Sequence, residues 1–350
     1  MPQLTTVDIE NYRCFQKLAV EGLSRVNLFV GRNNSGKTAF LEAVEAVVSE
    51  SSPFVLYRAS VERGEVRAVQ RRDEPGAVAI DIRRWFHGHR LEPGVGLRLK
   101  ASGEKPLSLS RTIEANPDPT LPLGLMLTLE RHLSIGVPPP LPIMPDGFLG
   151  AGSPARFVDF GLSMQRPVCF VTTRRLSASE LLPMWSKLVL TPSEGDVLTA
   201  LQSLEPSIDR FAMTGSNGDA SAQVLFKGAR EPVPLGSLGE GTTRMLTLAL
   251  SLATARGGVL LIDEIETGLH YTSHRSTWRL VIETAKRLDV QVFATTHSKD
   301  CLEAVARLYE DAPDLAEEVT IHRLEAGATT PVRMTVAMVA SNVESNLDVR

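Results

Sequence analysis

One short run of residues constrains the fold of this chain more than any other feature. Residues 31–38 read Gly-Arg-Asn-Asn-Ser-Gly-Lys-Thr, with four residues between the glycines and lysine and threonine after the second glycine. The preceding residues 26–30 are almost all apolar, as in a buried strand, and an apolar pattern of helical spacing follows over residues 40–48. A strand, a glycine-rich turn and a helix are the context in which this spacing forms a phosphate-binding loop.

The chemistry of this loop, the Walker A motif, follows from its residue types. Glycine lets backbone N–H groups curl around an anion, and the N-terminus of the following helix adds positive potential. Lys37 is placed to reach the β- and γ-phosphates of a nucleoside triphosphate, and Thr38 to offer its hydroxyl to Mg²⁺. The residues that we expect to bind the nucleotide are Gly31, Arg32, Asn33, Asn34, Ser35, Gly36, Lys37 and Thr38.

Composition narrows the class of protein. A chain of 350 residues has room for roughly two domains. The net charge of −4 argues against a globally basic nucleic-acid coat. The three cysteines (Cys14, Cys169 and Cys301) lie far apart, which fits a reducing cytosol and offers no zinc site. Because the N-terminus lacks a signal-peptide pattern and the longest apolar stretch, residues 245–255, is too short to cross a bilayer, we expect a cytoplasmic protein.

Alternating strand and helix patterns predict an α/β fold with a mainly parallel sheet flanked by helices. Strand patterns occupy residues 4–9, 18–23, 26–30, 167–171, 224–226, 259–262, 290–294 and 319–324. Helical patterns occupy residues 37–49, 179–187, 195–204, 242–255, 273–288 and 300–310. We expect the core to be divided by an insertion, so that the predicted units are residues 1–50, 51–165, 166–325 and a C-terminal tail over 326–350.

The segment over residues 51–165 differs in composition from both flanks. Prolines are dense from residue 106 to residue 154, and proline fixes φ and lacks an N–H group, so we expect an irregular subdomain of helices and loops. Arginines cluster between interleaved acidic residues, at Arg63, Arg67, Arg71, Arg72, Arg83, Arg84 and Arg90. A solvated surface of mixed charge is favoured over a nucleic-acid patch.

A second motif for phosphate chemistry, Walker B, lies far along the chain. Residues 259–262 are apolar on both faces of the predicted strand, and Asp263 and Glu264 follow at its carboxyl end. Open α/β sheets bind ligands at this end of their strands. We expect Asp263 to hold Mg²⁺ and Glu264 to orient or deprotonate the attacking water as a general base.

The next predicted strand ends in Ala-Thr-Thr-His-Ser, which places His297 beside the carboxylate strand. We interpret His297 as a sensor of the γ-phosphate or of the attacking water. The segment 266–270 between them is expected to be a turn near the nucleotide and at a subunit contact. His270 and His274 have the spacing of helical metal ligands, but no third ligand is evident, and the pair His87 and His89 is equally weak.

A glycine-rich segment also opens the helix that precedes Walker B. Backbone N–H groups at such a helix start form an anion site. Because the chain already has a phosphate loop, we interpret this second site as one for the γ-phosphate of a neighbouring subunit. The residues expected to act in this way are Leu238, Gly239, Glu240, Gly241 and Thr242.

The order of these motifs resembles that of ABC-type ATPases. Ile9–Phe15 (Ile-Glu-Asn-Tyr-Arg-Cys-Phe) before the phosphate loop is similar to the opening of the RecF, SMC and overcoming-lysogenization-defect (OLD) families. Leu261–His270 is most similar to OLD-like AAA-type ATPases. The resemblance covers about residues 1–50 and 165–325.

The resemblance implies a P-loop NTPase fold of ABC/RecF type that binds ATP and Mg²⁺ and hydrolyses ATP. It also implies a head-to-tail homodimer, in which each phosphate loop faces the helix start of the other subunit. The family motif there is Leu-Ser-x-Gly, and in this chain Gly239 replaces the serine. Thr242 is a candidate to supply the hydroxyl, and hydrolysis is expected to be slow.

Three functions are compatible with these features. The first is an ATP-hydrolysing switch for a separate effector such as a nuclease, in anti-phage defence or DNA repair, since only 53 residues follow His297, too few for the Toprim nuclease domain of OLD proteins. The second is a RecF-like DNA clamp, supported by the arginines of residues 63–100 and by Arg174 and Arg175. The third is a transporter ATPase subunit. The sequence leaves open the effector, DNA binding, ATP against GTP, the oligomer beyond a dimer and the role of residues 51–165.

Overall fold

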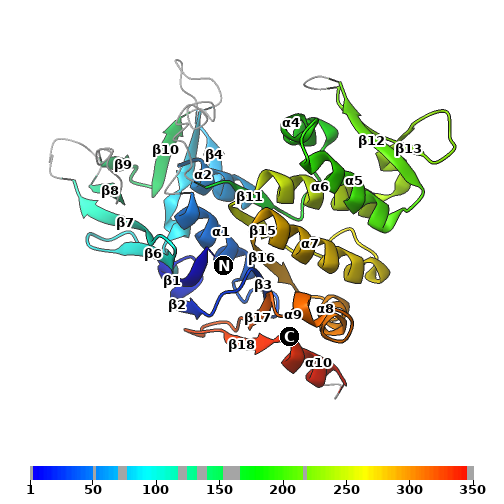
Figure 1. Cartoon of the computed structure of the whole chain (residues 1–350). Helices are drawn as coiled ribbons and strands as arrows, with labels where there is room; N and C mark the ends of the chain where they lie inside the picture. The colour runs from blue at the N-terminus through cyan, green and yellow to red at the C-terminus, as the bar shows by residue number, and fades with distance from the viewer. Residues whose placement is uncertain are drawn as a thin grey trace.

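A computed structural model describes residues 3–49, 53–69, 77–116, 124–131, 140–152, 166–215 and 219–344. Its helices are α1 (Lys37–Val48), α2 (Pro53–Glu62), α4 (Ala178–Leu188), α5 (Ser193–Leu204), α6 (Glu240–Thr254), α7 (His274–Leu288), α8 (Lys299–Asp311), α9 (Pro313–Ala316) and α10 (Val336–Glu344). The described strands form three sheets, and helices lie between and beside them (Figure 1).

The central six-stranded sheet carries the phosphate loop. Its strand order is β11 (Val168–Val171), β15 (Val259–Ile262), β16 (Gln291–Thr296), β3 (Val26–Val30), β17 (Val319–Arg323) and β18 (Val332–Thr335). The first five strands run parallel, and β18 pairs antiparallel with β17. Every residue of β3, β15 and β16 is buried, because both faces of a parallel sheet are covered. The carboxyl ends of these three strands therefore meet at one edge.

A nine-stranded antiparallel sheet lies on the side of α1 that faces away from the central sheet. Its strand order is β2 (Phe15–Glu21), β1 (Leu4–Tyr12), β6 (Gly96–Gly103), β7 (Leu107–Ala115), β8 (Leu125–Arg131), β9 (Leu141–Ile143), β10 (Phe148–Gly152), β5 (Val78–Asp81) and β4 (Val66–Ala68). Helix α1 lies between this sheet and the central sheet (Figure 1). Every residue of α1 except Thr38 is consequently buried.

Two of the buried residues of α1 are acidic. Glu42 pairs with Arg13 at 2.6 Å and with Arg63 at 2.7 Å, and Glu45 pairs with Arg58. A buried carboxylate requires such partners because the desolvation of an isolated charge is costly. These ion pairs attach α2 and the residue after it to the helix that begins at the phosphate loop.

The structure corrects the prediction for residues 51–165. Within the described part of this segment, β4–β10 form regular strands of the nine-stranded sheet, and only α2 and short turns are helical. The prolines gave a misleading signal, because Pro106 lies in the connection between β6 and β7 and Pro142 in the short strand β9. Alternation in β6, where Leu97, Leu99 and Ala101 are buried, marks a strand with one covered face.

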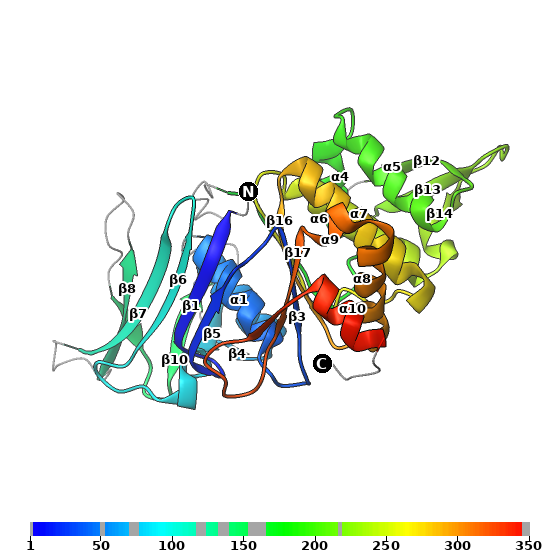
Figure 2. The ribbon, with the colours of Figure 1, turned by 60° about the horizontal axis from the view of Figure 1, so that its bottom comes forward.

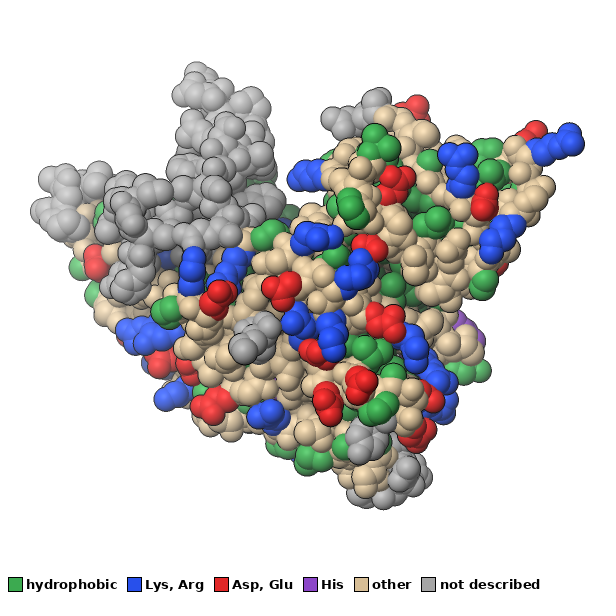
Figure 3. All heavy atoms as spheres, viewed as in Figure 1, with side chains coloured by type: hydrophobic (Ala, Val, Ile, Leu, Met, Phe, Trp, Pro, Cys, Tyr) green, Lys and Arg blue, Asp and Glu red, His purple; other side chains and the backbone are tan. Residues whose placement is uncertain are grey.

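Four arginines of the predicted cluster, Arg63, Arg67, Arg83 and Arg84, form ion pairs within the chain. Arg67 pairs with Asp146 at 2.6 Å, and Arg83 and Arg84 pair with Asp81 at 2.7 and 3.6 Å. Arg71 and Arg72 lie outside the described residues. Figure 3 shows basic and acidic side chains intermixed over the visible described face. These pairs favour the surface of mixed charge over a nucleic-acid patch.

Helices α6, α7 and α8 cover the other face of the central sheet and form a second core with it. Helices α4 and α5 pack outside α6, beside a small sheet of β12 (Ile208–Thr214), β13 (Ser221–Phe226) and β14 (Val233–Pro234) (Figure 2). None of the helices in the described ranges is long and apolar enough to cross a bilayer.

The predicted C-terminal tail is also corrected. Strand β18 extends the central sheet, with Met334 opposite Ile321, and α10 packs on α8 (Figure 2). Met334, Val336 and Val339 are buried in the second core. The described residues after 325 therefore belong to the same core as the central sheet, and residues 345–350 lie outside the described part.

Candidate nucleotide site

The phosphate loop lies between β3 and α1, as the sequence predicts. Gly36 precedes α1 with φ +98°, and a Cβ atom there would lie 2.5 Å from the ring of Phe15, so this position requires glycine. Lys37 Nζ donates to the carbonyl oxygens of Gly31 at 2.7 Å and Arg32 at 3.0 Å. Burial lowers the pKa of Lys37. The ammonium group is thus folded into the loop where an anion would bind.

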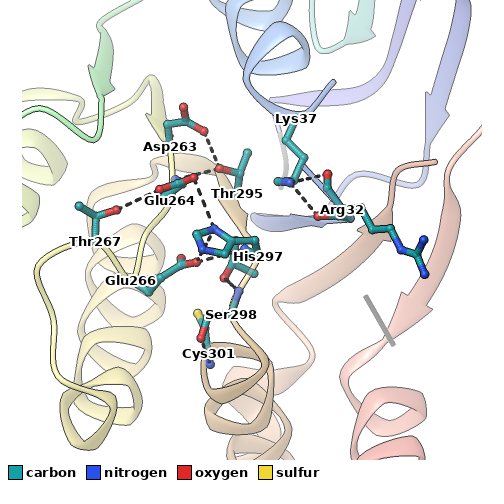
Figure 4. A network of polar contacts seen from close by, with 12 residues as sticks. Arg32, Lys37, Asp263, Glu264, Glu266, Thr267, Thr295, His297, Ser298 and Cys301 are labelled. Atoms are coloured by element: carbon teal, nitrogen blue, oxygen red, sulfur yellow. Dashed lines mark hydrogen bonds and ion pairs between the residues drawn. The ribbon is translucent and has the colours of Figure 1, made fainter. Parts of the chain in front are cut away.

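Not all eight loop residues face the same space. A cavity of about 580 Å³ is lined by Asn33, Asn34, Gly36, Lys37 and Thr38. Arg32 is exposed, and its guanidinium group points away from Lys37 in Figure 4.

The other two loop residues support the turn. Ser35 is buried, and its hydroxyl has no hydrogen-bond partner among the described residues. Gly31 packs closely against the backbone of Leu324. Contact of all eight loop residues with nucleotide stays a prediction.

A chain of hydroxyl and carboxylate groups joins the phosphate loop to Walker B. Thr38 Oγ1 donates to Asp263 Oδ2 at 2.9 Å, and Thr295 Oγ1 donates to Asp263 Oδ1 at 2.7 Å. Thr295 is buried at the carboxyl end of β16, and Asp263 follows β15. Mg²⁺ prefers oxygen ligands and takes one or two carboxylates, so the hydroxyl of Thr38 and the carboxylate of Asp263 fit this ion.

Glu264 is held in an unusual backbone conformation. Its φ is +47°, a left-handed value that costs energy for a side chain of this size. Its N–H donates to Thr295 Oγ1 at 2.8 Å, and Thr267 Oγ1 approaches its carboxylate at 3.4 Å. The carboxylate lines the cavity with Lys37. This position suits a group that acts on a water molecule beside the terminal phosphate.

His297 lies between two carboxylates. Its Nδ1 is 3.4 Å from Oε1 of Glu264 and 3.4 Å from Oε1 of Glu266 (Figure 4). The backbone N–H of His297 donates to Glu266 Oε1 at 3.1 Å. The structure therefore brings the predicted pair Glu264 and His297 together. It adds Glu266, which the sequence placed only in the turn near the nucleotide.

The cavity contains further residues that the phosphate-site motifs do not include. Arg13, Cys14 and Arg63 also line it. Arg63 also lines an adjoining cavity of about 420 Å³ that shares Thr38 and Asp263. Arg13 and Cys14 belong to the segment that resembles the RecF and SMC opening, which was the available signal. No motif in the sequence marks Arg63 as part of this site, because only the fold brings it next to α1.

Residues 238–242, which correspond to the family motif Leu-Ser-x-Gly and are called the signature segment below, line neither of these two cavities. Residues Gly239 and Glu240 are exposed at the N-terminus of α6, and Gly239 has φ +97° and ψ 174°. The hydroxyl of Thr242 is 3.4 Å from the carbonyl oxygen of Leu238, and Thr242 is buried. A Cβ on Gly268 would touch Glu240, so the turn after Walker B packs on the start of this helix.

The alternative metal sites gain no support. His270 contacts the hydroxyl of Thr272 at 2.9 Å, and His274 is buried at the start of α7. No group of three histidine, cysteine or acidic side chains suited to a metal occurs among the described residues.

Two family models match the chain. The model described as "AAA ATPase domain" matches residues 3–87, which include the phosphate loop. The model described as "AAA domain, putative AbiEii toxin, Type IV TA system" matches residues 154–300, which include the signature segment, Walker B and His297.

Individual proteins show the same relationship. A protein named "ATP/GTP phosphatase" from Helicobacter pylori is 20% identical over 364 residues, covering 92% of each chain. An SMC head bound to the C-winged helix domain of ScpA matches with a TM-score of 0.53 and 13% identity, over 95% of this chain and 98% of that one. An SMC head with an extended coiled coil, bound to the C-terminal domain of ScpA derived from Pyrococcus furiosus, matches with a TM-score of 0.51 and 12% identity. This match covers 99% of this chain and 100% of that one.

At these identities the solved structures establish a common fold, and the family models add the ATPase assignment. The loop around Lys37 and the carboxylates of Asp263 and Glu264 meet at one cavity within that fold. With this geometry and these family matches, the chain is a P-loop ATPase whose fold is similar to that of SMC heads.

Proposed function

We propose that the chain works as an ATP-dependent dimeric switch, in which two copies enclose two nucleotides, and that it controls a separate effector. One observation carries the proposal. None of residues 238–242 lines the cavity that contains Lys37, Thr38 and Glu264, or the cavity that adjoins it. Because Gly239 and Glu240 are exposed, a second copy is able to bring this helix start to the open side of the nucleotide.

Each residue of the site has a proposed role in hydrolysis. Lys37 would bind the β- and γ-phosphates, and Thr38 and Asp263 would hold Mg²⁺, which would neutralise charge on the phosphate oxygens. Glu264 accepts a proton from the attacking water, and His297 contacts the γ-phosphate or that water. His297 is oriented by Glu266, which accepts a hydrogen bond from its backbone N–H.

Glu264→Gln tests the sandwich directly. The amide cannot take a proton, so we expect turnover to fall at least about 100-fold while nucleotide binding is kept. Light scattering after gel filtration should show a dimer of this variant with ATP and a monomer with ADP. Lys37→Ala in the same background is the matched control and should stay monomeric with ATP. A monomeric Glu264→Gln protein at saturating ATP would contradict the proposal.

Mixing two inactive variants tests whether the signature segment acts on the partner. Lys37→Ala removes a phosphate ligand, and Gly241→Asp places a negative charge at the helix start where phosphate is expected. In the mixed dimer, one of the two composite sites contains both intact halves. We expect the mixture to recover ATP turnover that neither variant shows alone. No recovery at any mixing ratio would argue that the segment acts within its own chain.

The descriptions of similar proteins and of one matching family support the proposal of a separate effector. Both SMC heads of similar fold are bound to part of ScpA, and one matching family is described by a toxin of a toxin–antitoxin system. We infer a protein partner, such as a nuclease in anti-phage defence or DNA repair, that recognises the ATP-bound dimer.

Co-purification tests this inference. Proteins encoded by neighbouring genes should bind Glu264→Gln with ATP and dissociate with ADP, and nuclease activity of the complex should follow the same dependence. DNA binding by this chain alone, steeply weakened by salt, would instead favour a RecF-like clamp.

A further inference from the structure

A single arginine joins the signature helix to the catalytic strand. Arg244 lies on α6, four residues after Glu240, and is only 7% exposed. Its Nη1 donates to the carbonyl oxygen of Thr172 at 2.7 Å, just after β11. Its Nη2 donates to the carbonyl oxygens of Asp263 at 3.2 Å and Glu264 at 3.1 Å. One guanidinium group therefore contacts the ends of two neighbouring strands.

The charge of Arg244 is not required to fill this space. Among the described residues, it forms no ion pair with a carboxylate, and burial lowers the pKa of its guanidinium group. Desolvation of a buried cation costs several kcal/mol, and an apolar side chain of similar volume would avoid this cost. Carbonyl oxygens on two separate strands are, however, acceptors that the planar fork of arginine can engage together, which the compact ammonium group of lysine cannot do.

The peptide that Arg244 contacts is the strained one. Glu264 has φ +47°, and conformations of this kind persist only where surrounding groups impose them. Thr295 Oγ1 accepts the N–H of Glu264, and Arg244 binds its carbonyl oxygen. Both ends of the residue are thus fixed, one from β16 and the other from α6. A shift of α6 would move one of these two anchors.

We propose that Arg244 is a positioning residue, which couples the helix that carries residues 238–242 to the backbone of Glu264. The part of this inference that concerns the second subunit rests on the proposed dimeric function. A phosphate that binds the start of α6 fixes the helix, and Arg244 transmits that position to the carboxylate that acts on water. Occupation of the helix start then sets the rate of hydrolysis.

Arg244→Lys and Arg244→Met test this role, with Arg256→Lys as control. Arg256 follows the other end of α6 and contacts Ser193 Oγ, away from the cavity. We expect both Arg244 variants to bind a fluorescent ATP analogue within about threefold of wild type while kcat falls about 10- to 100-fold, since displaced catalytic groups cost this much. Arg256→Lys should keep both values. Circular dichroism monitors folding. If Arg244→Met does not fold, the result for Arg244→Lys is used to test the proposal.

A second readout separates coupling from simple support. Wild-type specific activity should rise with protein concentration as dimers form, and the Arg244 variants should lose this rise. Arg244→Lys combined with Glu264→Gln should nevertheless dimerise with ATP. Unchanged kcat, or equal losses of binding and turnover with an early thermal transition, would overturn the proposal. If Glu264→Gln itself stays monomeric, the dimer and the coupling to it fail, whereas a selective loss of kcat still supports positioning within one chain.

Discussion

The hydroxyl of Thr38 donates a 2.9 Å hydrogen bond to Oδ2 of Asp263, across 225 positions of sequence. The other carboxylate oxygen of Asp263 accepts a hydrogen bond from Thr295. Asp263 is therefore oriented by two hydroxyl groups, one from the first turn of α1 and the other from the carboxyl end of β16. Residues that orient a ligand in this way commonly influence metal affinity as much as activity.

Thr295→Val tests this orientation without touching the proposed metal ligands. Valine has nearly the same shape but removes the bond to Asp263 and the acceptor for the N–H of Glu264. We expect the Mg²⁺ concentration that gives half-maximal ATP turnover to rise about 10- to 100-fold. Thr254→Val is the control, because its hydroxyl bonds only the carbonyl oxygen of Leu250 on α6. An unchanged Mg²⁺ dependence in Thr295→Val would show that Asp263 needs no such support.

Glu266→Ala tests the histidine position. The carboxylate of Glu266 binds the backbone N–H of His297 and faces its ring, so its removal should free the ring to turn. We expect kcat to fall about 10- to 100-fold with ATP affinity preserved.

Glu266→Gln refines that test. Glutamine retains an oxygen acceptor for the N–H of His297, so it should lose less activity than the alanine variant. Glu283→Ala, on the exposed face of α7, should behave as wild type. Equal turnover in Glu266→Ala and wild type, measured by phosphate release, would remove Glu266 from the site.

The sequence predicted the parts of the site that are contiguous. The loop around Lys37 and the strand end at Asp263 are local patterns whose chemistry depends on neighbours in sequence. The roles of Glu266 and Arg63 were not predicted, because they depend on which helices and turns pack together. The strands of the 51–165 segment were missed for another reason: the prolines between residues 106 and 154 favoured loops, and the alternation of Leu97 and Leu99, which precedes them, was not weighed against that signal.

Gly239→Ser restores the residue that the ABC-type signature usually has. The backbone at Gly239, with φ +97° and ψ 174°, lies in a region that is almost exclusive to glycine, although a Cβ would meet open space. Serine should therefore cost about 1–3 kcal/mol of stability through backbone strain. We expect no gain in ATP turnover and a lower thermal midpoint.

Gly257→Ser provides the matched control for this variant. Gly257 also has positive φ, +69°, and open space, but it lies at the far end of α6. It should lose stability with turnover unchanged. Faster hydrolysis by Gly239→Ser than by wild type would show that the missing hydroxyl limits the reaction.

His322 makes stability depend on pH. Its ring is fully buried and stacks on that of Phe29, with 4.9 Å between the two ring centroids. Neither ring nitrogen has a hydrogen-bond partner among the described residues. Burial, with a smaller contribution from Arg333, lowers the pKa of His322 from 6.5 to about 4. Between these values the unfolded chain binds a proton that the folded chain does not. The free energy of unfolding is therefore unaffected by His322 above about pH 6.5 and decreases as the pH falls towards 4.

His322→Leu should remove this dependence. Leucine keeps an apolar group against Phe29 and cannot take up a proton in either state. Between pH 7.5 and pH 5 we expect wild type to lose about 2 kcal/mol of unfolding free energy more than this variant, from a pKa difference of this size. Urea unfolding at several pH values measures the difference. His89→Asn, at an exposed position with positive φ, should follow wild type. If His322→Leu loses stability as steeply as wild type over this range, another group must carry the acid sensitivity.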